Sequence, residues 1–400
     1  MEGRPSYREL LRIRNFLLLW TGQAVSYLGD QFHYIAIMGL LLYEYNVSAV
    51  EVGTLLVALS APSLIIGPIA GVYVDRWSRK WVMIFSDIIR GILVILIPFT
   101  TGLWQIYVIM FLVSSVSRFF FPAYTSTVPN IVHKEQLLVA NSLSQTTFNI
   151  TLVVGPATGA LMIGIMGYTA AFFIDGLTFF FSALMILRIH LLEEKKIGKG
   201  GIKEVFTQMK EGFVLIRGTR PVLFVISVFS GIMFFIGGIN VLLLIFVRDV
   251  LGMEIMHLGV LSGFQGAGMI LGALAVGFIG GRFQKRSLML VGTFFVGIFL
   301  AVFGVNPYML VSYGLMLLIG VSVSTLNIPA TTLLQEVIPD EIRGRVFGVQ
   351  GTLIQTFTIL SIGWESAVAN IIGARTLIIL VGLFCAGIGV VGRFFPEFTS

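Results

Sequence analysis

The chain has 400 residues, of which 56% are hydrophobic and only 12% are charged, and its mean hydropathy is +0.95. This composition excludes an ordinary water-soluble globule, which needs far more polar surface at this length, and it indicates a protein embedded in a lipid bilayer. The formal net charge is +6, and its origin follows from the distribution of basic residues along the predicted spans.

Long apolar runs recur from one end of the sequence to the other. A transmembrane helix needs about 20 mostly apolar residues to cross roughly 30 Å of hydrocarbon. The runs are too long, and lack the alternation, for the strands of a membrane barrel, so we predict an all-α integral membrane protein with twelve transmembrane helices in two pseudo-symmetric six-helix bundles. In chain order the spans are 15–43, 51–74, 80–100, 103–127, 137–165, 168–190, 221–247, 257–281, 287–305, 308–334, 346–371 and 374–394.

Basic residues set the predicted orientation, because Lys and Arg stay preferentially on the cytoplasmic side of a membrane. With a cytoplasmic N-terminus, 22 of the 26 basic residues fall in cytoplasmic segments. Only Arg248 and Arg375 lie outside, and Arg90 and Arg118 lie within spans. The sequence therefore predicts a multi-pass protein of the cell (inner) membrane with both termini in the cytoplasm. A basic face opposite anionic headgroups accounts for the charge without nucleic acid.

Asp30 lies near the middle of the first predicted span, beside Gln31 and His33. An ionisable side chain inside a bilayer costs about 2.5–3.5 kcal/mol on insertion scales, so it is a functional candidate by default. We expect Asp30 to carry a coupled proton or to bind a cationic group of a substrate. The structural alternative is a hydrogen-bonded Asp at a helix kinked by glycine. Asp30 and His33 alone are too few ligands for a metal ion.

A basic turn follows the second span at 71–80 and recurs about 206 residues later at 277–286. A repeat of nearly half the chain length predicts two related membrane bundles fused in tandem. The two copies differ at one position, where the first has Asp75 and the second has Gly281.

The basic residues of this turn are enough to set the membrane topology, so topology does not explain Asp75. Its own helix dipole disfavours an anion at the end of the second span, so Asp75 needs an external partner. That partner is a neighbouring arginine or the exposed N–H groups at the start of the predicted helix 346–371. We expect a latch that biases one conformation; the alternative is a solvated hairpin that only enforces topology. The latch residues are Gly71, Asp75, Arg76, Arg79 and Lys80.

The third and fourth spans carry three further charges. Asp87 and Arg90 share one helix face, and the antiparallel fourth span places Arg118 at the depth of Asp87, roughly 12 Å from the inner surface by helical rise. We expect an Asp87–Arg118 pair with Arg90 as a further partner, since pairing is what tolerates buried charge. The pair either holds the two helices together or acts as a switchable relay, and Arg90 is an alternative site for an anionic substrate.

Two further acids lie towards the outer ends of their spans. We interpret Asp175 and Glu365 as half-solvated rim residues, with Asp175 kept as a weaker coupling candidate. The repeat aligns Asp30 with Gly238, so the acidic switches are expected in the first bundle and the second mainly supplies the opposing cavity wall.

The fifth span contains Gly155, Pro156 and Gly159. These residues remove side chains from one face, so we expect a bend and close packing against a neighbouring helix. Polar side chains in several spans are candidates to line a central cavity. They are Gln31, Tyr34, Asn149, Asn240, Gln265, Asn327 and Gln355.

One long cytoplasmic connection divides the predicted spans at 191–220. Apolar residues recur at helical spacing from Ile202 to Ile216, which predicts an amphipathic helix on the inner membrane surface. We therefore expect an N-terminal six-helix bundle at 1–190, this linker, and a C-terminal six-helix bundle at 221–400.

The turn at 71–80 resembles the signature between the second and third helices of the major facilitator superfamily, with Ser78 where Gly is usual. Gly155-Pro156-x-x-Gly159 is similar to the antiporter signature of that superfamily, although Thr151 and Ala160 replace flanking glycines. Other motifs resemble the bacterial group of macrolide-efflux and enterobactin-exporter-like proteins, and lysophospholipid transporters and ferroportins share parts of the pattern. These motifs are Leu28-Gly29-Asp30, Phe121-Pro122-Ala123, Ala140-Asn141, Ile174-Asp175 and Ile338–Phe347.

Together these features predict a secondary active efflux transporter that exchanges protons for an amphipathic small molecule, such as a drug or a siderophore, by alternating access. The alternatives are a lysophospholipid transporter or flippase, a ferroportin-like metal exporter, and a non-transporting receptor or scaffold. The expected partners are the substrate, protons and membrane lipids, without nucleic acid, and the chain is expected to be a monomer. The sequence has no phosphate-binding loop or catalytic triad, and Cys385 is its only cysteine, so no enzyme activity, cofactor or intrachain disulfide is predicted.

Overall fold

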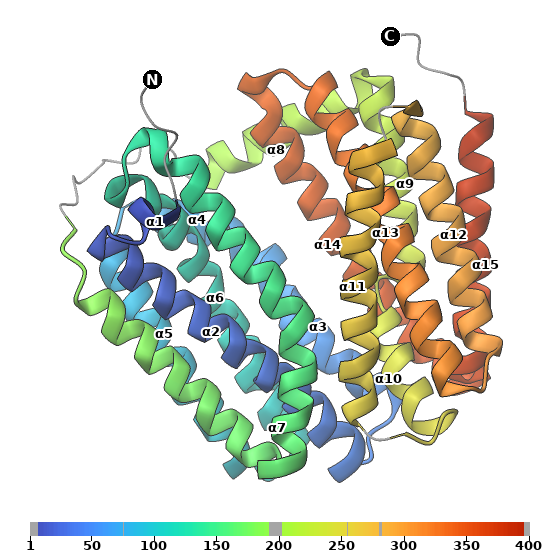
Figure 1. The fold of residues 1–400 in the computed structure, drawn as a ribbon, viewed down its shortest axis with the longest axis horizontal. Coiled ribbons are helices and arrows are strands. Elements are labelled where there is room, and N and C mark those ends of the chain that lie inside the picture. The colour runs from blue at the N-terminus through green and yellow to red at the C-terminus, as the bar shows by residue number, and fades with distance from the viewer. Residues whose placement is uncertain (1–6, 75, 192–201, 254, 280–281, 396–400) are drawn as a thin grey trace. The chain divides into compact units, whose positions relative to one another are not determined.

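The computed structural model describes residues 7–74, 76–191, 202–253, 255–279 and 282–395. Within these ranges the chain forms helices and short connections and no β-strand (Figure 1), and each predicted span coincides with one or two helices, which confirms the all-α prediction. The chain divides into two compact units. The first contains Met1–Leu40 and Ala58–Ile202, and the second contains Leu41–Val57 and Lys203–Ser400.

In the first unit α2 packs along α7, and α5 packs against both α6 and α7. The helix α3 crosses the unit boundary, and its second part belongs here. The helices of this unit are α1 (Tyr7–Leu10), α2 (Arg14–Gly39), α3 (Ala49–Ile65), α4 (Gly67–Val74), α5 (Arg79–Leu96), α6 (Leu103–Ile131) and α7 (Leu137–Leu187), with the 3-10 turns η2 (Ile97–Phe99) and η3 (Lys134–Gln136).

In the second unit α11 packs along α13, and α12 packs against both α13 and α15. A π-helical turn, η1 (Leu40–Glu44), leads into the segment that packs here, where the Tyr43 hydroxyl donates to the Met253 carbonyl at 2.6 Å. The helices are α8 (Ile202–Gly218), α9 (Arg220–Ile236), α10 (Ile239–Asp249), α11 (Ile255–Ile279), α12 (Lys285–Val305), α13 (Met309–Val337), α14 (Asp340–Ile372) and α15 (Ala374–Val391), followed by the 3-10 turn η5 (Gly392–Phe394).

Two glycines make corresponding tight hairpins in the two units. Gly167 (φ 79°, ψ 171°) separates the fifth and sixth predicted spans within α7, and Gly373 (φ 81°, ψ 151°) separates α14 from α15. Positive φ combined with extended ψ is open to glycine and strained for residues with a Cβ. The two hairpins lie 206 residues apart, which is also the interval between the two copies of the basic turn at 71–80 and 277–286.

Among the described residues, nine helices are long and apolar enough to cross a membrane, and one of them, Val139–Leu187, contains the two spans joined at Gly167. The predicted span 221–247 is not one continuous helix in the structure, because α9 ends at Ile236 and α10 begins at Ile239. The break falls at Gly237 and Gly238, which are poor helix formers.

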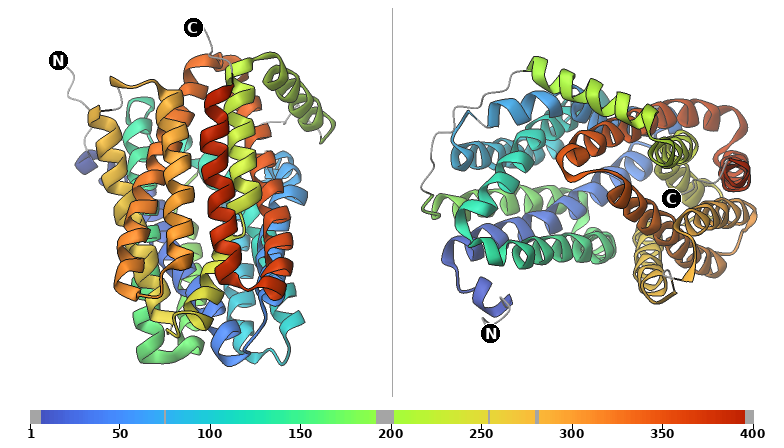
Figure 2. Two further views of the ribbon diagram at one scale, coloured as in Figure 1. Left: turned by 90° about the vertical axis from the view of Figure 1, so that its right-hand side faces the viewer. Right: turned by 90° about the horizontal axis from the view of Figure 1, so that it is seen from above.

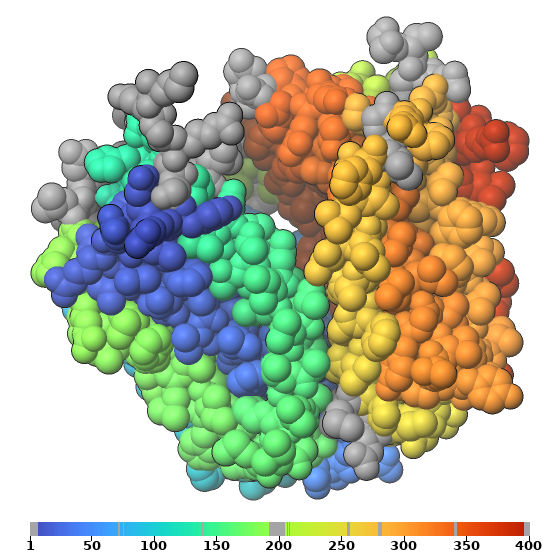
Figure 3. Space-filling view, in the orientation of Figure 1, coloured from blue at the N-terminus to red at the C-terminus, as the bar shows by residue number. Residues whose placement is uncertain are grey.

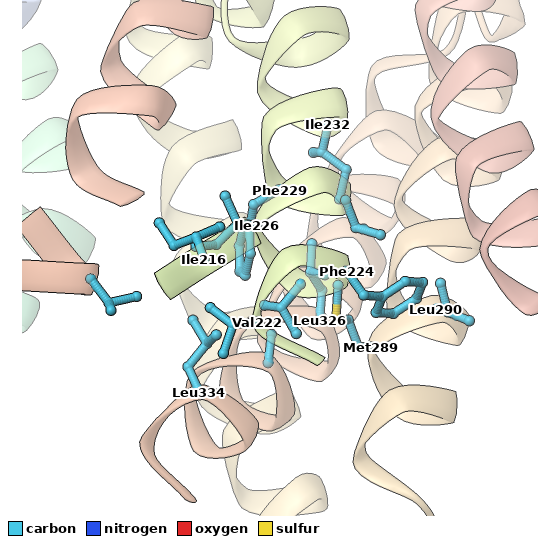
Figure 4. Packing of buried hydrophobic residues seen from close by; sticks show 14 of the residues in the cluster. Ile216, Val222, Phe224, Ile226, Phe229, Ile232, Met289, Leu290, Leu326 and Leu334 are labelled. Atoms are coloured by element: carbon cyan, nitrogen blue, oxygen red, sulfur yellow. The ribbon is translucent and has the colours of Figure 1, made fainter. Parts of the chain in front are cut away.

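Side chains fill the space between neighbouring helices within each unit (Figure 3). The buried cluster of the second unit joins residues of α9, α12, α13 and α14, including Phe224, Met289 and Leu326 (Figure 4). Small residues bring backbones together as well: a Cβ added at Gly382 of α15 would lie 2.6 Å from the Ala301 nitrogen of α12. Close backbone approach through small residues is the usual way in which membrane helices associate.

The predicted amphipathic helix of the linker is present as α8, but part of its apolar face packs on protein. Ile216 is buried in the core cluster of the second unit. Arg345 Nη1 of α14 lies 2.6 Å from Glu211 Oε2, and a Cβ at Gly212 would lie 2.8 Å from the Arg345 carbonyl oxygen. The division of the chain at 190 and 221 stays a prediction.

Candidate functional site

A cavity of about 280 Å³ in the first unit brings Asp30 and Arg118 to one place. Two helix faces build most of it. Asp30, His33 and Tyr34 stand at i, i+3 and i+4 on α2, and Ser114, Ser117 and Arg118 repeat this spacing on α6, so each trio projects from a single face. The remaining lining residues are Leu59, Met110 and Val113.

The Asp30 carboxylate is half-buried, and among the described residues it has no hydrogen-bond or ion-pair partner. The ionisable groups near enough to interact with it electrostatically include Asp175, Arg90 and His33. On the opposite wall, Arg118 has only a long contact of 3.5 Å from Nη2 to Ser114 Oγ, and no described carboxylate lies within 4.0 Å of it. The cavity therefore holds a carboxyl group and a guanidinium group that are not paired with each other.

His33 connects this cavity to α7. Its Nδ1 lies 2.9 Å from Asp175 Oδ2, and the two residues are 6% and 0% exposed. The Thr178 hydroxyl contacts the other oxygen of Asp175 at 3.3 Å. Gly29 makes this approach possible, because a Cβ there would collide with Asp175 and Thr178. Sequence reasoning placed His33 beside Asp30 and missed Asp175 as its partner.

The predicted Asp87–Arg118 pair is wrong. Asp87 pairs instead with Arg90, one turn along α5, and both side chains are buried. The Arg90 guanidinium lies between two rings, 4.6 Å from the centroid of Phe120 and 4.3 Å from that of Phe179. Helical rise matched the depths of Asp87 and Arg118, but rotation about the helix axes turns Arg118 into the cavity.

The interpretation of Asp175 and Glu365 as half-solvated rim residues is also wrong, because both are 0% exposed. In the second unit the Ser361 hydroxyl donates to Glu365 Oε1 at 2.6 Å, and the backbone N–H of Gly238 donates to the Ser361 oxygen at 3.1 Å. Distance from a span end does not measure burial, since neighbouring helices cover both acids. The second unit therefore holds a buried acid that the sequence analysis assigned to the rim.

Basic residues in both copies of the basic turn bind backbone carbonyls of neighbouring segments. In the first copy, Arg79 Nη1 donates to the Ser126 carbonyl at 2.9 Å, and Lys80 Nζ donates to the carbonyls of Leu187 and Ile189, each at 2.8 Å. Cations at helix C-termini are favourable both for the dipole and for the unpaired carbonyls.

The second copy repeats this arrangement only at Arg286, because Lys285 pairs with a carboxylate. Lys285 Nζ lies 2.9 Å from Glu336 Oε2, and Arg286 Nη2 donates to the carbonyls of Gly392 and Phe395 at 3.0 and 2.5 Å. Asp75 and Gly281, the position at which the copies differ, lie outside the described residues. Gly71 falls within α4 and Arg76 is exposed. The latch stays a prediction.

Gly155 and Gly159 lie where α7 approaches α2. They face Gln31 and Phe32, the two residues that follow Asp30. A Cβ at Gly155 would lie 2.6 Å from Gln31 Cβ, and one at Gly159 would lie 3.2 Å from Phe32 Cδ1. The expected close packing is confirmed. Pro156 lies inside the same helix. The two glycines of this motif let α7 pack closely against α2, the helix that carries Asp30.

The proposed polar lining residues fall into three groups. Tyr34 lines the Asp30 cavity, and Gln31 packs at Gly155. Asn149 and Asn240 are exposed, and Asn149 Oδ1 accepts a hydrogen bond from Gln145 at 3.0 Å. The half-buried residues are Gln265, Asn327 and Gln355. Among the described residues, no group of three or more His, Cys, Asp or Glu is placed to hold a metal ion.

Comparisons with known proteins agree with this architecture. Macrolide efflux protein A of Streptococcus pyogenes is 28% identical over 389 residues, covering 92% of this chain and 95% of that protein. The uncharacterized MFS-type transporter YfiS of Bacillus subtilis (strain 168) is 26% identical over 396 residues, covering 94% of this chain and 92% of that protein.

A crystal structure of a mutant of the nucleoside transporter NupG aligns with a TM-score of 0.78 at 13% identity, over 95% of this chain and 99% of that one, and so shows the same fold. The family model of the Major Facilitator Superfamily matches residues 19–362. Members of this family are membrane transporters and not enzymes. With the helical architecture and a match over most of its length, the chain belongs to the Major Facilitator Superfamily.

Proposed function

We propose that this transporter is a secondary active exporter that exchanges protons for an amphipathic small molecule by alternating access. The observation that carries the proposal is the Asp30 cavity, in which a half-buried carboxylate within a predicted span has no hydrogen-bond or ion-pair partner among the described residues and shares the space with a cation. Efflux is supported by the similarity to macrolide efflux protein A across the chain.

In this proposal Asp30 carries the exchanged proton or binds a cationic group of the substrate. An unpaired charge is costly in the bilayer interior, so Asp30 favours gaining a proton or a cationic ligand when water leaves the cavity. Arg118 supplies a positive charge on the opposite wall, which favours return of the carboxylate to its charged form. The buried His33–Asp175 pair joins α2 to α7, and Arg90, which is paired with Asp87 on α5, contacts rings of α6 and α7.

The remaining sequence predictions enter as parts of the same proposal. The segments 1–190 and 221–400 act as two bundles, both termini face the cytoplasm, and the chain works as a monomer in the cell membrane. The latch of Asp75 with Arg76, Arg79 and Lys80 biases one conformation. The hydrogen bonds from Arg79 and Lys80 to backbone carbonyls fix these two side chains to neighbouring helices, which supports a role for the turn in conformational change.

The test is proton-driven flux in everted membrane vesicles, with a radiolabelled macrolide as the probe and a pH-sensitive dye reporting the gradient. Wild-type protein is expected to accumulate the macrolide only with an imposed pH gradient, and macrolide addition is expected to dissipate that gradient. Asp30→Asn removes the titrating group while keeping its shape, so uptake is expected to fall to that of vesicles lacking the protein.

The matched control is Glu44→Gln, which neutralises an exposed carboxylate in η1 at the end of the same predicted span. It is expected to transport as wild type does. Unchanged gradient-driven uptake by Asp30→Asn would refute its role in coupling. Movement of fluorescent lysophospholipid in the same vesicles, without macrolide flux, would assign the chain to the lipid-transporting alternative.

A further inference from the structure

An apolar groove of about 970 Å³ runs along the second unit between α9 and α15. The two helices lie side by side (Figure 2, left), and two ring pairs bridge them. Phe224 and Phe395 have centroids 5.8 Å apart at one end, and Phe235 and Phe384 stack at 4.9 Å at the other. All four residues line the groove.

The length of the groove matches one leaflet of a membrane. Phe235 lies eleven residues after Phe224 along α9, which corresponds to about 16 Å of helical rise. Half of a hydrocarbon core of roughly 30 Å is about 15 Å. An acyl chain that enters at one ring pair therefore reaches the other near the middle of the bilayer.

Missing side chains keep the groove open. A Cβ added at Gly387 of α15 would meet no atom within 4 Å, so the wall there is hollow. The Ser227 side chain lines the opposite wall on α9 and is exposed. The lining is otherwise mostly hydrocarbon and aromatic, which suits a lipid chain better than a polar ligand.

Guanidinium groups gather at the end marked by Phe224 and Phe395. Arg220, the first residue of α9, lines the groove with an exposed side chain, and no described carboxylate lies within 4.0 Å of it. The Arg286 guanidinium lies 4.9 Å from the Phe224 ring centroid. Arg393 in η5 is exposed at the same end of α15. A phosphate at this end meets positive charge, whereas no basic residue lines the groove at the end marked by Phe235 and Phe384.

We propose that this groove binds one phospholipid with an anionic headgroup, its acyl chain between α9 and α15 and its phosphate at Arg220. Apolar surface and basic side chains at the membrane interface are the two elements of specific lipid binding. This site is separate from the Asp30 cavity, and the proposal stands whether or not the chain couples transport to protons.

Native mass spectrometry tests the proposal on the full-length protein, taken from nanodiscs of equal phosphatidylglycerol and phosphatidylcholine. Wild-type protein is expected to retain one phosphatidylglycerol. Gly387→Leu fills the groove from α15 and is expected to lose this lipid. Arg220→Gln is expected to keep a bound lipid but to weaken the preference for phosphatidylglycerol about fivefold, since one arginine near an anionic surface is worth about 1 kcal/mol.

Two controls and one further variant keep the result interpretable. Gly314→Leu makes the same change at an exposed glycine of α13 with open space around it, and Arg282→Gln removes an exposed arginine of the basic turn; both are expected to retain the lipid. Ser227→Leu fills the groove from α9 and replaces Gly387→Leu if that variant does not fold. Equal retention by the filled and control variants, or equal retention of both lipids by wild type, would overturn the proposal.

Discussion

The two units carry their membrane-buried acids on different helices and in different surroundings. In the first unit Asp30 projects from α2 into a cavity that also receives Arg118. The repeat aligns Asp30 with Gly238 of the second unit, and there the carboxylate comes from α14: Glu365 Oε2 would lie 3.0 Å from a Cβ added at Gly238. The acid beside this position is therefore carried by a different helix in each unit.

This difference separates what the repeat preserves from what it does not. Packing elements recur, namely the hairpin glycines Gly167 and Gly373 and the cations Lys80 and Arg286 at helix ends. The ionisable groups do not. Asp30 is half-buried beside a cavity and has no described partner, whereas Glu365 is 0% exposed and is held by Ser361. The proposed function accordingly assigns proton exchange to Asp30, and we expect a structural role for Glu365.

The largest effect is expected from the buried Arg90–Asp87 pair of α5, whose guanidinium lies over rings of α6 and α7. Arg90→Leu leaves Asp87 buried without its cation and removes the contacts with Phe120 and Phe179. The free energy of unfolding is expected to fall by about 3–5 kcal/mol, because breaking a buried pair strands a charge. Reversible unfolding in mixed micelles measures the change.

The double variant Asp87→Leu/Arg90→Leu separates charge from packing at this site. It leaves no unpaired charge, so most of the lost stability is expected to return. A double variant as unstable as Arg90→Leu would show that the ring contacts, and not the charge pair, hold these three helices together.

A smaller effect is expected where the second unit has glycine in place of Asp30. A Cβ at Gly238 would lie 2.9 Å from the Ile362 Cα as well as close to Glu365. Gly238→Ala is therefore expected to reduce the free energy of unfolding by about 1–3 kcal/mol through overpacking. Gly263→Ala in α11 is the control, because nothing lies within 4 Å of its added Cβ. Equal stability of the two variants would mean that α14 can shift to admit a side chain at this position.

The sequence was sufficient for most of the fold and for part of the site. The apolar runs of the sequence coincide with helices in the described residues, and the hairpins at Gly167 and Gly373 fall at predicted boundaries. Asp30 was identified by the cost of a charge in hydrocarbon. The break at Gly237 and Gly238 was missed because glycine is frequent in membrane helices and marks no single conformation.

Partners of the buried charges could not be read from the sequence, since they depend on rotation about each helix axis. His33 and Asp175 are 142 residues apart, and no local spacing links them. For Asp87 the correct partner was already present one turn away at Arg90, but equal depth favoured Arg118 instead. The spacing shared by Ser114, Ser117 and Arg118 was a usable signal that α6 presents a polar face.

The smallest effect is expected from Glu365→Gln, although the residue is among the most buried acids of the chain. The amide keeps the shape of the carboxyl and can still accept the Ser361 hydrogen bond, so neither packing nor stability should change greatly. In the vesicle assay it is expected to transport the macrolide at the wild-type rate, in contrast to Asp30→Asn. Loss of gradient-driven uptake with normal folding would instead place a second proton site on α14, and both units would then contribute an exchangeable acid from different helices.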